Sequence, residues 1–547
     1  MQTNIQDSLI VLIKEALVKL GFSQDSSLDL FLDFPTDSRF GELTTNIALR
    51  LAKQAKKPPQ QVAQDLVAAL NVLLENSPLK AYIQQVKVEG AGFVNFYFSS
   101  QYFYQQLAAI LKDGEGFFKD NSGQGKRVLL EFVSANPTGP LSVAHARQAA
   151  VGDALSRVMS FLGFVVEKEY YLNDEGNQIN ILGRSVQLRL QELKGEKAEF
   201  PEDHYQGEYI YDIAKEAAKL PDQQAATLAE FAVKYILDII KKELDDFGVK
   251  FDSWYSQKEL SKSGKIDIAL AALRDLGFLY DEDGAAWFKS TGFGDDKDRV
   301  VIKSGGSYTY LAPDIAYHQD KYARGFSWLI NLWGPDHHGY ISRLKASVAA
   351  FGQGPQSLSV IIVQLATIFR GGKPLQMSTR RGQYITLREV LDEVGLDGAR
   401  FFFLMRRTSS HLDFDLEVAK KQTPENPVYY VQYAHARIAN IIKNSQLNPD
   451  LEKLDLTLLK EEEELKLIKK LLAFKNTLHI CIATLDPYML TVYLQELSQC
   501  FHKFYDQHRV LGPDEELSVS RLALIQAVKI VLALGLELLG VSRPEKM

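Results

Sequence analysis

A serine and a histidine stand three residues apart at the expected start of a helix, in the stretch EFVSANPTGPLSVAHARQAAVGDAL that begins at Glu131. An apolar strand breaks at a Pro- and Gly-rich turn and a helical pattern begins near Leu141, so Ser142 and His145 share one face of the first turn. A helix N-terminus presents unpaired N–H groups, and an imidazole there adds a donor for a phosphate. The spacing indicates a phosphate site, although a structural role explains His145 alone equally well.

A basic loop follows the last apolar strand, in GGKPLQMSTRRGQYITL. Lys373, Arg380 and Arg381 lie between glycines there, where a loop can close over a bound polyphosphate. Such cations would neutralise charge as pyrophosphate leaves. A basic loop by itself is weak evidence of function. Combined with a helix-start histidine across a nucleotide-binding sheet, it predicts a site for a nucleoside triphosphate.

A third turn at a strand end, LWGPDHHGY, places Asp336, His337 and His338 before another helix. Adjacent histidines are poor ligands for one metal ion, and the two cysteines, Cys481 and Cys500, lie far along the chain. We therefore expect no zinc and no protein metal site. Contact with an adenosine is the favoured role of this turn.

These turns need a sheet that brings them to one edge, and residues from about 116 to 385 repeat a strand-then-helix rhythm. RVLLEFV is a continuous apolar run, a helix follows, and FVVEKEYY is the next strand, which makes a βαβ unit. The rhythm resumes at RVVIKS and continues through WLINLW and LSVIIVQLA after a charged helical insertion at about 180–297. We predict an α/β fold with a doubly wound, Rossmann-like parallel sheet whose ligands bind at the strand carboxyl ends.

Two further domains flank this sheet. Residues 1–115 alternate helical patterns with short β-rich pieces, which predicts an α+β domain containing a hairpin at VKVEGAGFVNFYF. Phe93 and Asn95 in this hairpin fit either sheet packing or contact with a looped-out base. From 386 to 547 strand signals stop, and heptad-like apolar spacing predicts an all-α bundle.

The composition limits the setting of the protein. A chain of 547 residues with 46% hydrophobic content exceeds what one core sustains, which agrees with three domains. The net charge of −7 gives no overall attraction to nucleic acid, so such a partner needs local basic patches. Two cysteines fit a reducing, cytoplasmic compartment. Lys14 and Glu15 interrupt the first apolar stretch, unlike a secretory signal, and no uncharged apolar run approaches the roughly 20 residues of a membrane span.

Together these motifs resemble those of the arginyl-tRNA synthetases, a family of class I aminoacyl-tRNA synthetases. SVAH aligns with the HIGH signature of the class and QMSTR with its KMSKS signature. More specific to the family are EFVSANPTGPL, YYLNDEGNQI, YLAPDIAYH, GPDHHGY, NPVYYVQYAHARI and LGVSRPEKM. FGELTTNIALRLAK and GAGFVNFYF resemble its additional N-terminal domain, which contacts the tRNA elbow. The resemblance extends over the whole chain.

The resemblance implies roles for individual residues. Those implied to be catalytic are His145, Ser142, Arg380 and Lys373. Those implied to bind arginine are Glu131, Asn136, Tyr310 and Asp314. ATP would contact Ser142, His145, Asp336, His337, Met377, Ser378, Arg380 and Arg381. Contacts to tRNA would come from Phe93, Asn95, Tyr429, Tyr433 and Arg437.

The chemistry of arginine supports this pocket independently. A guanidinium is a planar fork of donors that prefers carboxylates, and Glu131 and Asp314 both fall near strand or helix ends around one crevice. Tyr310, four residues before Asp314, would lie beside it, and the amide of Asn136 suits the α-amino or carboxylate group. Two alternatives stay open: Asp314 as a helix N-terminal carboxylate, and Glu131 as the partner of an internal basic residue. For Tyr429 and its neighbours, a packed helix interface is the alternative to base stacking.

The chain also departs from the class signatures. Ser142 stands where the first HIGH histidine is expected, Ala144 where the glycine is, and Gln376 and Thr379 where two KMSKS lysines are. A serine can hydrogen-bond a phosphate but adds no positive charge, so the missing cations are either replaced, with Lys373, Arg380 and Arg381 as the candidates, or done without. Losing one phosphate donor costs about 2 to 4 kcal/mol in a transition state.

The implied activity is arginine–tRNA ligation. ATP and arginine would form arginyl-adenylate and pyrophosphate, with Mg²⁺ bound alongside ATP, and the 2′-hydroxyl of the terminal adenosine of tRNA(Arg) would then take the arginyl group. The family usually requires bound tRNA for the first step and is usually monomeric. Other hypotheses are a different class I synthetase, such as the cysteine or glutamine type, a simple nucleotidyltransferase, and a non-catalytic tRNA-binding paralogue.

Overall fold

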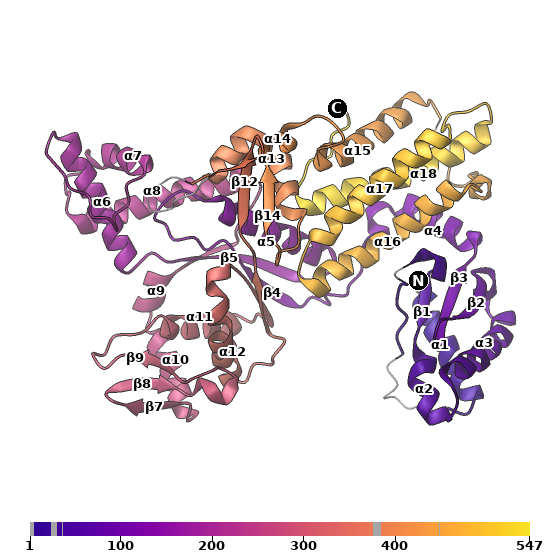
Figure 1. The fold of residues 1–547 in the computed structure, drawn as a ribbon, viewed down its shortest axis with the longest axis horizontal. Helices are drawn as coiled ribbons and strands as arrows, with labels where there is room; N and C mark the ends of the chain where they lie inside the picture. Colours follow the sequence, from indigo (N-terminus) through magenta and orange to yellow (C-terminus); the bar gives the residue numbers. More distant parts are fainter. Residues whose placement is uncertain (1–4, 23–29, 36, 376–383, 448) are drawn as a thin grey trace. The chain divides into compact units, whose positions relative to one another are not determined.

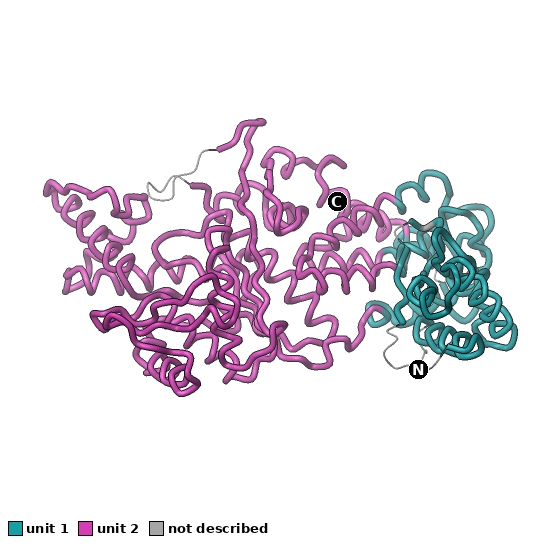
Figure 2. The backbone as a smooth tube through the Cα atoms, turned by 60° about the horizontal axis from the view of Figure 1, so that its bottom comes forward, with its two compact units in different colours: residues 1–117, 442–472, 500–528 teal, residues 118–441, 473–499, 529–547 magenta. Residues whose placement is uncertain are grey.

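A computed structural model of the chain describes residues 5–22, 30–35, 37–375, 384–447 and 449–547. They fall into two compact units (Figure 2). Unit 1 comprises residues 1–117, 442–472 and 500–528, and unit 2 comprises residues 118–441, 473–499 and 529–547. Several residues of the predicted phosphate loop lie outside the described residues: Gln376, Met377, Ser378, Thr379, Arg380 and Arg381.

Unit 1 begins with the predicted α+β domain. Its sheet has the order β1-β3-β2, and β2 (Ile83–Glu89) and β3 (Phe93–Phe98) form the predicted antiparallel hairpin. Gly92 in the connecting turn has a positive φ, and a Cβ there would lie 3.0 Å from the backbone of Pro59. The remaining elements of this domain are β1 (Leu43–Thr45), α1 (Ile5–Lys19), α2 (Ile47–Ala55), α3 (Pro59–Glu75) and α4 (Ser100–Asp113).

Unit 2 is built on a five-stranded sheet of order β11-β10-β4-β5-β6, in which every neighbouring pair is parallel. Its strands are β4 (Arg127–Glu131), β5 (Val165–Leu172), β6 (Ser253–Ser256), β10 (Trp328–Trp333) and β11 (Leu358–Ile362) (Figure 1). The order of the strands reverses between β4 and β10, where a ligand crevice is expected at the carboxyl ends. The predicted doubly wound sheet is confirmed.

Helix α5 (Val143–Phe161) returns from β4 and is buried along most of its length. Gly152 permits its close approach to the sheet, since a Cβ there would lie 2.4 Å from the ring of Phe132. The fully buried Arg147 donates to the backbone carbonyls of Gln364, Arg407 and Ser410 over 2.7, 2.9 and 2.9 Å. Burial lowers the pKa of Arg147 to about 10, so the guanidinium stays charged at neutral pH and fixes the start of α5 to both segments.

The insertion at 180–297, predicted as helical, is only partly helical. Its helices are α6 (Asn177–Leu193), α7 (Glu208–Ala217), α8 (Ala225–Asp246), α9 (Gln257–Lys262) and α10 (Lys265–Asp275). Strand β6 lies within the same range but joins the main sheet. Strands β7 (Leu279–Glu282), β8 (Ala285–Phe288) and β9 (Arg299–Ile302) form a separate antiparallel sheet. The prediction that RVVIKS belongs to the parallel sheet is therefore wrong, because an isolated apolar run does not specify its partner. Asp283 and Gly284, both with positive φ, form the hairpin turn that signals this sheet.

A second correction concerns the zone after residue 385. Strand β14 (Leu412–Asp415) lies there and pairs in parallel with β12 (Ala366–Arg370), which also pairs with β13 (Lys373–Pro374). The rest of the zone is helical as predicted: α13 (Leu387–Leu404), α14 (Leu416–Lys420), α15 (Pro427–Asn444), α16 (Glu462–Thr484), α17 (Tyr488–Gln507) and α18 (Glu515–Leu539). A four-residue strand gives too short an alternation to stand out between long helical patterns.

Helix α18 passes the length and composition test for a membrane span, but 72% of its most apolar window is buried inside the protein. The chain returns to unit 2 within this helix, at Lys529, and the residues at and after the end of the helix form hydrogen bonds with α13. The Leu539 carbonyl accepts a hydrogen bond from Arg400 over 2.9 Å, and the Ser542 N–H donates to Asp397 over 2.8 Å. Gly540 has φ +68°, and a Cβ there would lie 2.4 Å from the Arg400 guanidinium. The close packing of this segment therefore requires glycine at residue 540.

The buried carboxylate of Asp153, on α5 in unit 2, forms ion pairs with three cations. Arg400 and Arg157 both donate to its Oδ2 over 2.7 Å, and Lys168 of β5 donates to its Oδ1 over 3.1 Å. Burial by itself would raise the pKa of Asp153, but these cations, Arg400 foremost, hold it below its usual range. The network joins α5, α13 and β5.

Replacing Arg400 with methionine should destabilise unit 2 by about 3 kcal/mol, because a buried carboxylate loses its fully buried counter-charge. Arg157→Met is the matched control, since it removes a partner of the same carboxylate whose side chain is 37% exposed, and it should cost about 1 kcal/mol or less. Urea unfolding followed by tryptophan fluorescence measures both losses. Equal losses would contradict the central place of Arg400.

Candidate active site

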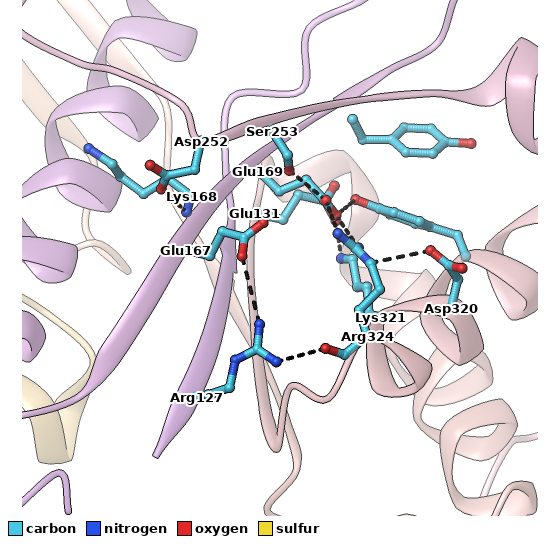
Figure 3. A network of polar contacts seen from close by, with 12 residues as sticks. Arg127, Glu131, Glu167, Lys168, Glu169, Asp252, Ser253, Asp320, Lys321 and Arg324 are labelled. Atoms are coloured by element: carbon cyan, nitrogen blue, oxygen red, sulfur yellow. Dashed lines mark hydrogen bonds and ion pairs between the residues drawn. The ribbon is translucent and has the colours of Figure 1, made fainter. Parts of the chain in front are cut away.

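The crevice between β4 and β10 contains a buried carboxylate at the end of β4. Glu131 is this residue, and it stands opposite Asn331 of β10 in the sheet register. The ammonium of Lys321, on α11 (Leu311–Ala323), donates to Glu131 Oε2 over 2.5 Å and lies 4.1 Å from the centre of the Tyr317 ring (Figure 3). Ser134 donates to the other oxygen of Glu131 over 3.2 Å. Glu131 thus has an internal basic partner, the alternative that the sequence left open.

A chain of hydrogen bonds continues from this ion pair. Lys321 Nζ also donates to Asn331 Oδ1 over 3.3 Å, and Asn331 Nδ2 donates to His318 Nε2 over 2.9 Å. His318 Nδ1 then donates to the carbonyl of Asp314 over 2.8 Å. Burial, reinforced by the charge of Lys321, lowers the pKa of His318 well below its usual value, so its ring is neutral with the proton on Nδ1. The chain fixes α11 against both strands of the crevice.

Asp314 presents the second carboxylate from the first turn of α11. Its Oδ2 accepts a hydrogen bond over 2.6 Å from the hydroxyl of Tyr340, which ends the 3₁₀ helix η5 (Pro335–Tyr340). Burial raises the pKa of Asp314 to about 7, and the nearby charge of Glu131 adds to this while the Tyr340 hydrogen bond opposes it. Tyr310 does not pack beside Asp314 as predicted; it is 83% exposed at the position that precedes the helix. A residue at this position lies outside the shared face of the first helical turn.

Strand β5 adds a further buried carboxylate, Glu169, whose hydrogen-bonding capacity is met within the protein. Arg324 forms a two-pronged pair with it, with N–O distances of 2.6 and 2.9 Å, and Tyr317 and Ser253 each donate to it over 2.7 Å (Figure 3). Burial would raise the pKa of Glu169, but Arg324 in particular holds it below its usual range. We infer that this cluster positions α11 and does not bind a ligand.

The first turn of α5 supplies hydrogen-bond donors for an anion. Ser142 precedes the helix, and its backbone N–H donates to His145 Nδ1 over 3.2 Å, while its hydroxyl lies 3.1 Å from the same atom. Because Nδ1 accepts a hydrogen bond, the ring proton is on Nε2. Burial lowers the pKa of His145 to about 4, with Asp336 opposing the shift, so the ring is a neutral donor at physiological pH. This arrangement can bind a phosphate without any change of protonation.

The other predicted nucleotide and arginine contacts are more exposed. Asn136 is half-buried and donates to Gln178 over 2.6 Å. Asp336 and His337 have side chains 77% and 58% exposed and lie 3.4 Å apart in η5. Lys373 is exposed in β13.

Three family models match the chain. The arginyl-tRNA synthetase N-terminal domain matches residues 7–98, the catalytic domain of the class I tRNA synthetases for arginine matches residues 106–444, and the DALR anticodon-binding domain matches residues 431–547. Two similar curated relatives are the arginine–tRNA ligases of Citrifermentans bemidjiense and Bacillus subtilis. They are 46% and 44% identical over 526 and 557 residues, which cover 94% and 99% of both sequences. The chain belongs to the arginyl-tRNA synthetase family.

Solved structures agree with this membership. A putative arginyl-tRNA synthetase from Campylobacter jejuni is 36% identical with a TM-score of 0.76, and the match covers 82% of this chain and 100% of that one. The Thermus thermophilus arginyl-tRNA synthetase shares the fold over 100% of both chains, with a TM-score of 0.77 at 22% identity. The protein is thus a class I arginine–tRNA ligase, an ATP-dependent enzyme whose substrates are arginine, ATP and tRNA. Membership rules out the hypotheses of another class I synthetase and of a simple nucleotidyltransferase.

The residues predicted to contact tRNA differ in accessibility. Asn95 of the synthetase is 3% exposed and accepts a hydrogen bond from Thr44 over 2.5 Å, so a base does not reach it in this conformation. Its role is sheet packing, the alternative weighed from the sequence, whereas Phe93 is 39% exposed. On α15, the rings of Tyr429 and Tyr433 stack with centroids 6.0 Å apart and 9° between their planes.

Sequence reasoning missed several residues that shape the synthetase crevice. Asp314, His318 and Lys321 recur at positions i, i+4 and i+7, the spacing of a single helix face. Polar residues on the face that a helix turns toward a sheet are unusual, and this pattern was a signal that the sequence contained. Tyr340 and Asn331 gave no comparable signal, since each depends on packing between distant segments.

Arginine should bind more weakly as the pH falls below 7. If Asp314 holds the guanidinium, it must be ionised to do so, and burial raises its pKa to about 7, so the dissociation constant should rise about tenfold per pH unit below that value and level off above it. Neither neutral histidine interferes, because the pKa values of His145 and His318 both lie well below this window. Isothermal titration calorimetry with L-arginine between about pH 5.5 and 8.5 measures the profile.

Two variants check the assignment to Asp314. Asp314→Asn should bind arginine weakly at every pH and lose the dependence. The exposed Asp336→Asn should keep the wild-type profile, since this carboxylate is 77% exposed and lies beside His337. A profile that stays flat in the wild type would show that Asp314 does not contact the guanidinium.

Proposed function

We propose that the synthetase holds the guanidinium of arginine between Asp314 and Glu131. The observation that supports this is the balance of charge in the crevice: the buried Glu131 and the half-buried Asp314 lie near one buried ammonium, that of Lys321. With Asp314 ionised these three groups sum to one negative charge, which matches one guanidinium. Asn136 holds the α-amino or carboxylate group of the amino acid, and Tyr310 covers the bound substrate.

The first turn of α5 binds the phosphates of ATP in this proposal. His145 donates through Nε2, and Ser142 fixes the ring that makes this donation. Because the donor is neutral, it stabilises the phosphate by hydrogen bonding, and positive charge must come from elsewhere. Lys373 and Arg380 supply this charge on the pyrophosphate side. Further ATP contacts come from Asp336, His337, Met377, Ser378 and Arg381.

The reaction then proceeds by two displacements without a protein nucleophile. The arginine carboxylate attacks the α-phosphorus of ATP, the bond to the bridging oxygen breaks, and pyrophosphate leaves. The 2′-hydroxyl of the terminal adenosine of tRNA(Arg) next attacks the arginyl carbonyl carbon, and AMP leaves. Catalysis is therefore positioning together with stabilisation of charge on the phosphates.

Mg²⁺ accompanies ATP as part of the substrate. In the part of the chain that the structure describes, no group of three His, Cys, Asp or Glu side chains is placed to hold a metal ion. We therefore expect the ATP phosphates to provide the main ligands of Mg²⁺, and we expect no zinc.

The rest of the chain serves the tRNA. We place the domain that meets the tRNA elbow at residues 1–115 and the catalytic domain at 116–385. The anticodon-binding bundle comprises residues 386–547. Phe93 of the first domain stacks on a base, as do Tyr429 and Tyr433 of the bundle, with Arg437 adding a cation 5.7 Å from the Tyr433 ring. The enzyme acts as a cytoplasmic monomer and does not require a membrane.

Exchange of ³²P between pyrophosphate and ATP tests this proposal. We expect exchange with arginine and none with lysine or glutamine, because only a guanidinium supplies the fork of donors that the two carboxylates need. We expect exchange only when cognate tRNA is present. Tight tRNA binding with no exchange for any amino acid would instead support a non-catalytic tRNA-binding paralogue.

The role of His145 has its own test. His145→Ala should slow exchange about 100-fold to 1,000-fold with little change in arginine affinity, since it removes a phosphate donor. Ser142→Ala is the matched control, because the backbone N–H of residue 142 still bonds the ring, and it should slow exchange less. If the two variants lost the same activity, the ring would not be the phosphate donor.

A further inference from the structure

A polar cavity in unit 2 involves none of the residues assigned to arginine or ATP. Its volume is about 290 Å³. The loop between α13 and β14, the start of β14 and the first residue of α17 form it. The lining residues are Arg406, Arg407, Ser410, His411, Asp413 and Tyr488.

The backbone around this cavity is held firmly. Thr408 donates through its N–H and its hydroxyl to Asp486 Oδ2, over 2.9 and 3.1 Å, and Asp486 Oδ1 accepts from the Tyr488 N–H over 3.0 Å. The buried Arg147 bonds the carbonyls of Arg407 and Ser410 from the opposite end of the loop. The loop that lines the cavity is therefore fixed to α5 through Arg147 and to the start of α17 through Asp486.

The two arginines of the cavity are available for a ligand. Both are exposed, and among the described residues neither guanidinium forms an ion pair or a hydrogen bond. The Arg407 guanidinium lies 5.5 Å from the centre of the Tyr488 ring. By contrast, Arg324, Arg388 and Arg400 of the same unit are each paired with a carboxylate. Two adjacent guanidiniums that are not paired directly with a carboxylate attract an anion with oxygen acceptors.

We propose that this cavity binds one phosphodiester group of the tRNA backbone, with the adjoining ribose or base packed on Tyr488. The inference rests on the proposed use of tRNA as substrate. The charges of Arg406, Arg407 and Asp413 sum to one positive charge, which matches the single negative charge of a phosphodiester. Pyrophosphate and ATP carry several negative charges, which exceed the net positive charge of the cavity, and the Asp413 carboxylate would repel them more strongly than it repels a phosphodiester. An aromatic ring beside cations is also the usual surface for a nucleic acid strand.

The connection between the cavity and α5 indicates what such a contact would do. Arg147 holds its loop and lies two residues after His145 on α5. A phosphate bound between Arg406 and Arg407 is therefore fixed relative to the helix whose first turn holds the ATP phosphates. The RNA strand would be set in register with the crevice by a rigid connection.

Binding of tRNA to charge-neutralised variants tests the inference. Arg406→Gln and Arg407→Gln should each weaken tRNA binding about tenfold at moderate salt, the effect of losing one charge-assisted hydrogen bond. In the double variant, the slope of log K against log salt should fall by roughly one, as expected for one lost phosphate contact. Filter binding with cognate tRNA over a salt series measures both quantities.

The matched control is Lys297→Gln, at an exposed cation of unit 2 that has no ion pair among the described residues. It should bind tRNA as the wild type does. Tyr488→Phe should also keep wild-type affinity, because it retains the ring, whereas Tyr488→Leu should lose part of it. Thermal unfolding midpoints equal to that of the wild type would establish that the arginine variants are folded.

The outcomes separate this inference from the proposed function. Wild-type affinity and salt slope in the double variant would overturn the tRNA backbone site. An increased KM for ATP with unchanged tRNA binding would also overturn it, since the cavity would then bind a nucleotide phosphate. Failure of the wild-type enzyme itself to exchange pyrophosphate with arginine would count against the proposed function, whatever the variants do.

Discussion

The buried ion pair between Lys321 and Glu131 determines the shape of the crevice. Burying two charges costs several kcal/mol of lost hydration, which their attraction offsets only when the remaining donors and acceptors are also satisfied. Lys321 meets this condition with Asn331 and the face of Tyr317, and Ser134 completes Glu131. Because these partners come from α11 and from both strands at the switch point, none of the three elements can shift alone. The crevice proposed to bind arginine is thereby held in one shape before any substrate binds.

The start of α5 shows how the fold accommodates a departure from the class signature. Serine is among the best residues for the position before a helix, so Ser142 adds a helix cap where the signature has a histidine. Backbone hydrogen bonds from Val143 to Ile385 and from Leu387 to Leu141 tie the same turn to the segment after the basic loop. The start of α5 and the segment from Ile385 to Leu387 are therefore joined through the backbone, independently of which side chains they carry.

Much of the architecture follows from the sequence because buried parallel strands are continuous apolar runs and amphipathic helices repeat with a clear period. Short strands escaped this reasoning: β9 and β14 have four residues each, and their partners are set by tertiary packing. Glu131 and Asp314 were accessible through the chemistry of a guanidinium. Lys321 was missed, because a lysine in a charged helix is normally a surface residue, although its helical spacing from Asp314 and His318 was visible in the sequence.

Predictions for single side chains were limited for the same reason, since tertiary packing decides where a side chain lies. Asn95 and Tyr310 belong to motifs that the family resemblance points to, yet one is buried in a sheet and the other lies in solvent. Motif membership constrains which residue is present, whereas exposure depends on neighbours from distant segments. The pKa of Asp314 likewise reflects burial beside Glu131, which adjacent residues in the chain do not reveal.

The return of the chain to unit 2 within α18 has a consequence for biosynthesis. Arg400 completes its hydrogen bonds with the Leu539 carbonyl, and Asp397 receives the Ser542 N–H, so the catalytic unit is completed by residues that the ribosome makes long after the sheet. A nascent chain that stops before residue 539 leaves the guanidinium beside Asp153 without one of its acceptors. A chain interrupted before residue 539 therefore lacks contacts that hold α13 in the complete enzyme.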